Sequence, residues 1–399
     1  MESLLRENPQ YVIVFEKPSD ANETLLAGVL KVQHSEPGRA ESRTSRRILQ
    51  QQNGVHARVY ARLAVAVANL TPEQVDSLRA EPQVQSVARN QRRTLPPLVL
   101  AAAQAPVAGT GAPAPVNRAL EQIGLDPLAT SPSGKNIKVA VIDTGIDLTH
   151  PDLSVLPGNT RSFVPDEPDV ADLNGHGTHC AGVIAGRFSP QGGFRYGVAP
   201  GCELIIAKVL NKFGQGYDDQ ILDAIDWAAD QGASVLSMSL GSPRSAGQPY
   251  SDPYERVAQV LLTQGIVLVA AAGNESERPA MIAPVGNPAA CPSILAVAAV
   301  DGRDQPAYFS CGDTDGIGRI DLAAPGVGVY SAWIGGEHKR LSGTSMAAPH
   351  VSGVAALYME QFPALSGQAL WDRMTVDAAT LISPATDVGA GMVQAPKPV

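Results

Sequence analysis

The pattern of apolar and polar residues near the start of the chain predicts a small folded domain. Short apolar stretches at 11–15, 56–67 and 84–88 are expected to form strands. A helix is expected to begin after Thr71, because threonine can cap a helix and Pro72 suits the first helical position. Strands interrupted by one helix predict a small α+β domain.

The rest of the chain alternates wholly apolar runs with segments of helical spacing. The runs, expected to be strands, are 137–142, 204–209, 235–238, 266–270 and 294–298. Helices are expected near 176, over 218–231 and over 254–264. Strands that are apolar on both faces and alternate with helices predict an α/β fold with a parallel sheet covered on both sides. In such folds, functional residues gather beyond the C-terminal ends of the strands.

A segment rich in proline, alanine and glycine separates the two patterns. No charged residue lies between Arg93 and Arg118, which is typical of a linker. We therefore expect an N-terminal domain at 1–93, a linker at 94–116 and a larger domain at 117–399. The first domain carries 13 basic and 10 acidic residues, whereas the remainder has a net charge of −12. Opposite charges predict that the two domains attract each other.

Composition excludes several classes of protein. A hydrophobic content of 44% in 399 residues allows a large core and excludes a wholly disordered chain. The net charge of −9 argues against a general nucleic-acid binder, and the longest apolar runs are too short to span a membrane. None of the four cysteines forms a C-x-x-C pair, which excludes a zinc ribbon. Residues 1–10 contain charges and no apolar stretch, so no signal peptide is expected there.

Two polar residues stand where strand ends and helix starts are expected. Asp143 follows an apolar run and begins Asp-Thr-Gly, a loop also used by aspartic proteases or by phosphate and metal sites. An aspartic protease needs a second such aspartate, and the chain has none. His176 is either only the first residue of a helix or a residue with a catalytic or metal-binding role. A zinc site with His179 and Cys180 is an alternative, but no fourth ligand is indicated.

Ser345 and Asn274 are two further candidates for residues that take part in catalysis. Ser345 precedes a segment of small residues that can begin a helix, where a serine is usually a cap. The same place offers free backbone N–H groups that could bind an oxyanion. Asn274 follows a buried run, either as a turn residue or as an amide donor to a developing negative charge.

Together these segments resemble the subtilisin-like serine proteases. The order Asp143, His176, Ser345 is that of the family, and the segments 141–147 (VIDTGID), 176–179 (HGTH) and 343–350 (GTSMAAPH) are nearly diagnostic. The resemblance covers 117–392 and implies a three-layer fold and a serine endopeptidase with these three residues as its triad. It further implies that the Asn274 amide and the Ser345 N–H hold the oxyanion, with Thr344 as an additional donor.

The resemblance also implies where a substrate peptide binds. Two edge segments would pair with it as an added strand, and an uncharged pocket would favour a large apolar residue before the cleaved bond. Ile221 and Leu240 would line a second apolar pocket further upstream, unless they are plain core. The implied substrate-binding residues are Gly214, Gly216, Ser239, Leu240, Gly241, Ala271, Ala272, Gly273, Gly286 and Ile221.

Residues 10–93 resemble, more loosely, the inhibitory propeptide of the same family. The resemblance thus implies a zymogen that cleaves itself between Leu95 and Ala105, with Leu98 or Leu100 best placed before the bond. It implies a secreted monomer that acts on proteins or peptides, with its own propeptide as intramolecular inhibitor. No nucleic acid or membrane is an expected partner.

The resemblance implies no cofactor for catalysis, although a structural calcium ion is an option. Asp152 matches a calcium ligand of the family, but the partner loop 187–196 differs from the family pattern. Cys291 and Cys311 flank a strand and its following loop and are candidates for a disulfide.

Two rival functions remain to be weighed against the peptidase. An inactive binding module would lack a triad or oxyanion residue, and none is missing. An ester or lipid hydrolase of the Gly-x-Ser-x-Gly class would have the order Ser, Asp, His, which this chain does not have.

Overall fold

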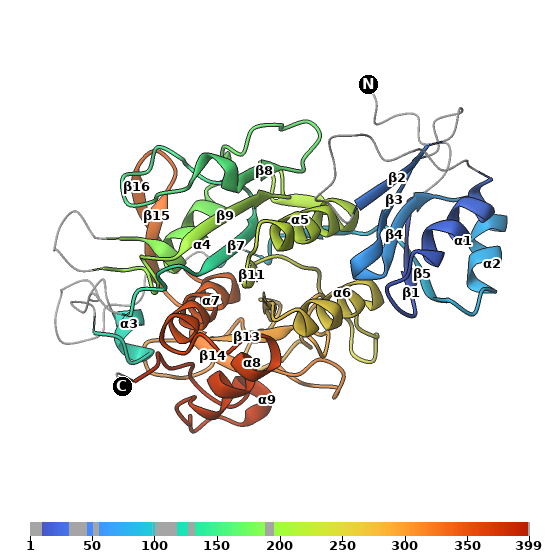
Figure 1. Ribbon diagram of the computed structural model, residues 1–399. Helices are drawn as coiled ribbons and strands as arrows, with labels where there is room; N and C mark the ends of the chain where they lie inside the picture. Colours follow the sequence, from blue (N-terminus) through green and yellow to red (C-terminus); the bar gives the residue numbers. More distant parts are fainter. Residues whose placement is uncertain are drawn as a thin grey trace.

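The computed structural model describes residues 10–31, 46–50, 56–97, 99, 118–126, 132–187 and 195–397. Two folded units lie side by side, a small one near the N-terminus and a large one that contains the remainder (Figure 1). Among the described residues, no helix is both long and apolar enough to cross a membrane.

The large unit is built on a seven-stranded sheet in which every strand pair is parallel. Its strands, in spatial order, are β14 (Leu322–Pro325), β13 (Leu295–Val300), β12 (Val267–Ala271), β11 (Val235–Met238), β7 (Lys138–Asp143), β9 (Glu203–Lys208) and β8 (Thr160–Ser162). The central strands are apolar and buried on both faces, which confirms the parallel sheet predicted from the wholly apolar runs.

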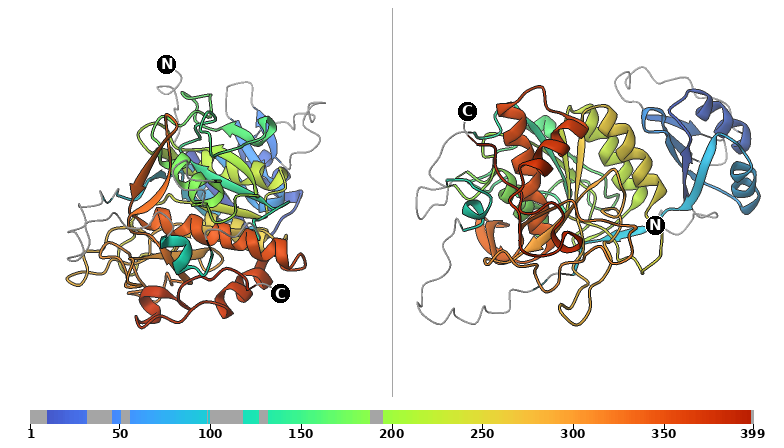
Figure 2. Two further views of the ribbon diagram at one scale, coloured as in Figure 1. Left: turned by 90° about the vertical axis from the view of Figure 1, so that its left-hand side faces the viewer. Right: turned by 90° about the horizontal axis from the view of Figure 1, so that it is seen from below.

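Helices cover both faces of this sheet and produce three layers, as the right-hand view of Figure 2 shows. On one face α4 (His176–Ala185) and α7 (Thr344–Gln361) pack together, and on the other lie α5 (Asp218–Asp230) and α6 (Asp252–Thr263). The remaining elements are α3 (Arg118–Gln122), η3 (Pro157–Asn159), β10 (Gln215–Tyr217), β15 (Val329–Trp333), β16 (Glu337–Leu341), α8 (Gly367–Val376) and α9 (Ala385–Val388).

The small unit is an antiparallel sheet with helices and an apolar core of its own. Its elements are β1 (Gln10–Phe15), α1 (Ala21–Leu30), β2 (Arg46–Gln50), β3 (His56–Tyr60), η2 (Ala61–Leu63), β4 (Val65–Asn69), α2 (Pro72–Arg79), β5 (Val84–Arg89) and β6 (Arg92–Thr94). The predicted cap of α2 is confirmed, because Thr71 Oγ1 accepts a hydrogen bond from the Gln74 N–H and Gln74 Oε1 accepts one from the Thr71 N–H.

One predicted strand of the small unit is wrong. The stretch 56–67 was expected to be continuous, but it forms the hairpin of β3 and β4. The chain reverses through η2 and through Ala64, whose φ of +55° lies in the left-handed region. Alanine rarely adopts this conformation, so the sequence carries no signal for the turn.

The small unit rests on α5 and α6 of the large one. The outer face of its sheet contributes Val12, Val14, Val65 and Val67 to the apolar core of the large unit. Its last strand, β6, pairs with β10 of the large unit, which leads residues 92–97 across the C-terminal edge of the parallel sheet. This edge is where parallel sheets concentrate their functional residues.

Candidate active site

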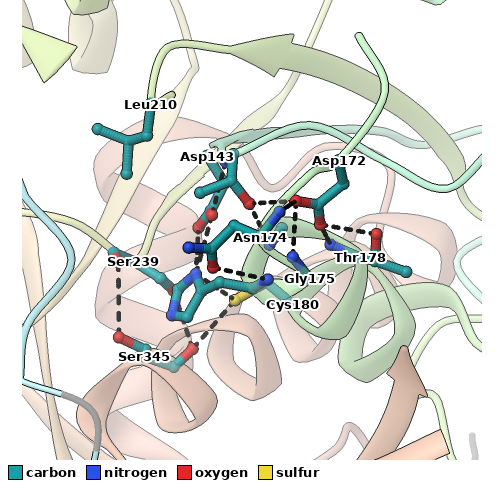
Figure 3. A network of polar contacts seen from close by, with 12 residues as sticks. Asp143, Asp172, Asn174, Gly175, Thr178, Cys180, Leu210, Ser239 and Ser345 are labelled. Carbon is teal, nitrogen blue, oxygen red and sulfur yellow. Dashed lines mark hydrogen bonds and ion pairs between the residues drawn. The ribbon is translucent and has the colours of Figure 1, made fainter. Parts of the chain in front are cut away.

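The fold brings the candidate aspartate and histidine into direct contact. Figure 3 shows Asp143 within a network of polar contacts that also includes Asp172, Cys180 and Ser345. Asp143 is the last residue of β7, and His176 is the first residue of α4. The two carboxylate oxygens of Asp143 lie 2.8 and 3.0 Å from His176 Nδ1, and both side chains are buried. Burial alone would lower the pKa of His176, but the Asp143 carboxylate outweighs it and raises that pKa well above its ordinary value.

A second carboxylate, Asp172, organises the turn that leads into α4 and was not identified from the sequence. Its Oδ1 accepts hydrogen bonds from Thr144 Oγ1, the Asn174 N–H and the Gly175 N–H, at 2.8–3.0 Å. Its Oδ2 accepts from the N–H and hydroxyl of Thr178. Asp172 therefore fixes the start of α4 to the end of β7, and with it the position of the imidazole. The available signal was an aspartate shortly before a helix start.

Ser345 lies at the second position of α7, close to this pair. Its backbone carbonyl accepts a hydrogen bond from the Ser239 hydroxyl at 2.9 Å, and its Oγ has a long contact of 3.5 Å with the Ser239 carbonyl. His176 Nε2 is buried, and no hydrogen-bond partner is found for it among the described residues. The imidazole thus has one nitrogen on Asp143 and the other free to accept a proton.

Asn274 presents its amide N–H₂ group to the segment 92–97, which crosses the C-terminal edge of the sheet. Its Oδ1 accepts hydrogen bonds from the Thr344 N–H and the Thr344 hydroxyl, at 2.9 and 2.8 Å, so the amide can point only one way. Its Nδ2 donates to the backbone carbonyl of Pro97 at 3.1 Å. Because the Thr344 hydroxyl donates to Asn274, in this arrangement it positions the amide instead of reaching an oxyanion itself.

The Asn274 amide leads to a prediction about turnover. If Asn274 is the oxyanion donor that the resemblance implies, replacing it with leucine should lower kcat about 10²–10³-fold with KM nearly unchanged. This range is the one known for such an amide donor in subtilisin, a member of the family that the sequence resembles. Steady-state kinetics on a peptide substrate measures both constants. Thr344→Ser keeps the orienting hydroxyl and should remain close to wild type. A rise in KM that equals the loss in kcat would instead assign Asn274 to ground-state binding.

Residues 92–95 occupy the cleft as an added strand. The N–H and carbonyl of Thr94 form hydrogen bonds of 2.9 Å with Gly241, and the Leu95 N–H donates to the Gly214 carbonyl at 3.0 Å. Arg93 lies opposite Gly216 in the antiparallel pairing of β6 with β10. The structure thus brings together the two edge segments that were expected to bind a peptide, with the chain's own tail between them.

An apolar pocket opens beside this strand. The residues that line it are Thr94, Pro96, Leu240, Gly241, Ser242, Pro243, Ala271, Ala272, Gly273, Glu275, Gly286 and Asn287. An added Cβ at Gly286 would lie 2.8 Å from the Ser242 carbonyl oxygen, so a side chain there would need a local shift. The expectation of uncharged walls needs correction, because the carboxylate-bearing Glu275 is among them. Ile221, which was expected in a second pocket further upstream unless it is plain core, is fully buried in the main core. Leu240 lines the pocket described here.

The four cysteines are all free thiols, so the suggested disulfide between Cys291 and Cys311 is not formed. Cys291 Sγ donates to the Ser251 carbonyl, and Cys311 Sγ donates to Glu275 Oε2. Each thiol is therefore held by a different neighbour.

The geometry does not assemble the alternative zinc ligands either. His179 Nε2 lies 3.1 Å from each of two backbone carbonyls, those of Val329 and Lys339, and burial lowers the pKa of this histidine to about 3. Cys180 Sγ lies 3.8 Å from His176 Nδ1 and contacts the Ser345 carbonyl at 3.5 Å, so of the three candidate ligands only His176 and Cys180 come together. His179 is therefore directed to the β15–β16 hairpin and not to the side of α4 that carries Cys180.

The surroundings of Asp152 do not fit a calcium ion. Its Oδ2 accepts a hydrogen bond from Tyr196 OH at 3.0 Å and lies 2.7 Å from His338 Nε2. A second imidazole, that of His150, is part of the same cluster. Calcium prefers six to eight oxygen ligands, whereas the described residues here offer one carboxylate among histidines and a phenol. Residues 188–194 of the partner loop lie outside the described residues.

Comparisons with known proteins find a matching family for most of the large unit. The model of a family described as the subtilase family matches residues 134–394. Subtilisin of Bacillus pumilus is 40% identical over 262 residues, which are 65% of this chain and 90% of that protein. The M-protease of Shouchella clausii (strain KSM-K16) is 36% identical over 335 residues, 84% of this chain and 78% of that protein. A match of that length within 399 residues includes part of the small N-terminal unit.

Proposed function

The chain belongs to the subtilase family and is a subtilisin-like serine endopeptidase, and we propose that Asp143, His176 and Ser345 are its catalytic triad. Ser345 Oγ attacks the carbonyl carbon of the scissile bond while His176 Nε2 accepts the hydroxyl proton and later donates it to the leaving amine. Asp143 holds the Nδ1–H tautomer and stabilises the imidazolium. Water then hydrolyses the acyl-enzyme, and the reaction requires no cofactor.

The position of the Pro97 carbonyl is the observation on which this proposal rests most strongly. Asn274 Nδ2 donates to that oxygen while the preceding residues are paired as an added strand. The Asn274 amide thus already donates to a peptide carbonyl of the tail, that of Pro97, which follows the pocket residue Pro96. A substrate with its residue before the bond in that pocket would bring its own carbonyl near this amide and near the Ser345 N–H at the start of α7. Asn274 and this backbone N–H would then stabilise the tetrahedral oxyanion.

The acyl-enzyme gives a direct test of the mechanism. Mixing the processed enzyme with a chromogenic ester should release an initial burst of alcohol equal to the enzyme concentration, followed by slower steady turnover. A matched Ser345→Ala sample should show no burst. Steady turnover with no burst at any substrate concentration or pH, together with no trapped acyl group after acid quenching, would argue against covalent catalysis.

The apolar pocket supports a preference for large apolar residues before the scissile bond. Alanine and glycine form its walls and Gly286 its floor, while the carboxylate-bearing Glu275 is one of its lining residues. Peptides that differ only at this position should be cleaved fastest with Phe, Leu, Tyr or Met, because these side chains bury the most apolar surface there. Faster cleavage after Arg or Lys would contradict the pocket assignment.

The N-terminal unit is proposed to be an inhibitory propeptide. Its sheet packs on α5 and α6, and its arginines pair with aspartates of α5: Arg58 with Asp219 and Asp223, and Arg62 with Asp226 and Asp230. Its tail fills the cleft that a substrate would need. These contacts support a unit that blocks the enzyme until it is removed.

Inhibition by the separated N-terminal fragment tests this role. Added to the processed enzyme, the fragment should inhibit hydrolysis, less tightly at high salt, because ion pairs contribute to docking. Arg58→Ala in the fragment should weaken inhibition by about 10-fold or more, since it removes the ion pairs with both Asp219 and Asp223. Arg79→Ala is the matched control, because Arg79 donates to the Val87 carbonyl within the small unit. A fragment that never inhibits would refute the propeptide role.

Self-cleavage is proposed to occur between Leu95 and Ala105, after Leu98 or Leu100 and not at the bond between Pro96 and Pro97. Pro96 lines the apolar pocket and Pro97 contacts Asn274. A bond between two prolines is a poor substrate, because proline has a fixed φ and no N–H. Leu98 and Leu100, the preferred residues before the bond, lie outside the described residues. Cleavage after either one requires the tail to shift along the cleft.

We further propose that the enzyme is secreted and works as a monomer on protein or peptide substrates. The resemblance to subtilisins supports the extracellular location. Cell fractionation of the native host should recover the activity outside the cells, and light scattering of the processed enzyme should give the mass of one chain. Activity confined to the cell interior would contradict secretion. A stable dimer would contradict the monomeric state.

A further inference from the structure

An arginine of the tail is buried in a polar pocket of the cleft. The Arg93 side chain is only 2% exposed, and its Nε lies 2.6 Å from Asp218 Oδ1. A second guanidinium nitrogen lies 3.1 Å from Asp218 Oδ2, so the contact is bidentate. A third donates to Ser242 Oγ, and the guanidinium carbon lies 5.4 Å from the centre of the Tyr254 ring. Carboxylate, hydroxyl and aromatic face together are chemically matched to guanidinium.

The pocket is held in place by groups of the large unit. Asp218 is the first residue of α5, where the helix end favours a negative charge. Tyr254 OH, from α6, donates to Asp218 Oδ1 at 2.9 Å and orients the carboxylate. Both residues belong to the peptidase and stay in place when the tail leaves. The carboxylate would then face an open cleft with its orientation already fixed.

Arg93 also occupies the backbone position that a substrate residue would take. It belongs to the strand that pairs with β10, and it precedes by three residues Pro96, which lines the apolar pocket. With Pro96 as the residue before the scissile bond, Arg93 is the fourth residue before it. The other interdomain arginines differ, because Arg58 and Arg62 are about one-quarter exposed and project from the body of the small unit.

We propose that the processed peptidase selects arginine at the fourth position before the scissile bond, with Asp218 as the residue that determines this specificity. This inference rests on the proposed function and names its substrate class: peptides with arginine at that position and a large apolar residue before the bond. Lysine should be accepted less well, because its single ammonium cannot engage both carboxylate oxygens and Ser242 in the same plane. The apolar upstream pocket expected from Ile221 and Leu240 is thereby replaced by a charged one.

Three matched fluorogenic peptides test the proposal: Arg-Ala-Ala-Phe, Lys-Ala-Ala-Phe and Ala-Ala-Ala-Phe, each with the leaving group after Phe. For the processed wild type, kcat/KM should be about 10- to 100-fold higher with arginine than with alanine, with lysine in between. Asp218→Asn should bring the arginine-to-alanine ratio of kcat/KM close to one. Asp226→Asn removes the same charge from the same helix but pairs with Arg62, so it should keep the preference.

The possible outcomes separate this proposal from the proposed function. Equal cleavage of the arginine and alanine peptides by the wild type overturns the specificity but leaves the peptidase assignment intact. A preference that survives in Asp218→Asn, or that disappears equally in Asp226→Asn, also overturns it, because it then reflects general attraction to an acidic surface. Failure to cleave all three peptides counts against the peptidase assignment itself. The wild-type ratio alone can refute the proposal if Asp218→Asn does not fold.

Discussion

Replacing Ser345 with alanine should lower peptide hydrolysis about 10⁶-fold, the magnitude known for loss of the nucleophile in subtilisin, a relative of this chain. The fold should be preserved, because a small residue replaces another at a buried helix start. The variant should also remain a single chain, whereas the wild type should separate into two fragments by self-cleavage. Turnover assays and gel electrophoresis of the freshly produced proteins measure the two effects.

Ser352→Ala is the matched control for this result. Ser352 is buried in the same helix, and its hydroxyl donates to the Ala348 carbonyl within that helix. Its replacement should leave both hydrolysis and self-cleavage close to wild type. Near-normal hydrolysis by Ser345→Ala would remove Ser345 from the triad, and processing of that variant without added protease would show that cleavage is not autocatalytic.

Replacing Asp143 with asparagine should reduce kcat by about 10⁴-fold, because the amide no longer holds the tautomer that accepts the serine proton. The pH dependence should change as well. The Asp143 carboxylate raises the pKa of His176. The proposed mechanism requires the neutral imidazole, so activity should be lost as pH falls through that pKa. Without the carboxylate the pKa falls, and the acid limb of the kcat profile should move to lower pH.

A pH–rate profile of both enzymes from acid to neutral pH measures this shift. Asp166→Asn serves as the control, because it removes an exposed carboxylate of the same domain and should leave the profile unchanged. An acid limb at the same pH in wild type and Asp143→Asn would mean that another group limits the rate. An acid limb that moves to higher pH would contradict the charge interaction itself.

Much of the fold could be predicted because its signals are local. Strands buried on both faces must be apolar throughout, and this pattern is visible at β11, β12 and β13. The cap of α2 depends on residues three apart, so it too is visible in the sequence. The hairpin turn at Ala64 was missed because neither glycine nor proline marks it.

The charged part of the cleft could not be predicted, for a different physical reason. Arg93 and Asp218 are 125 residues apart in the chain, and each alone is an ordinary surface type of residue. Only the pairing of β6 with β10 brings them together. The same holds for Asp172, whose five hydrogen bonds depend on how β7 and α4 meet. The candidate triad was visible because the segments around it are family motifs.

Covalent labelling tests the central claim most directly. The processed enzyme is treated with a fluorophosphonate, digested, and its peptides are mapped by mass spectrometry. The account predicts one label per chain, on Ser345, with slower labelling of the unprocessed chain, whose tail places Pro97 against Asn274. An active enzyme that acquires no label, or a label on another residue while Ser345 remains free, would contradict the assignment of Ser345 as the nucleophile.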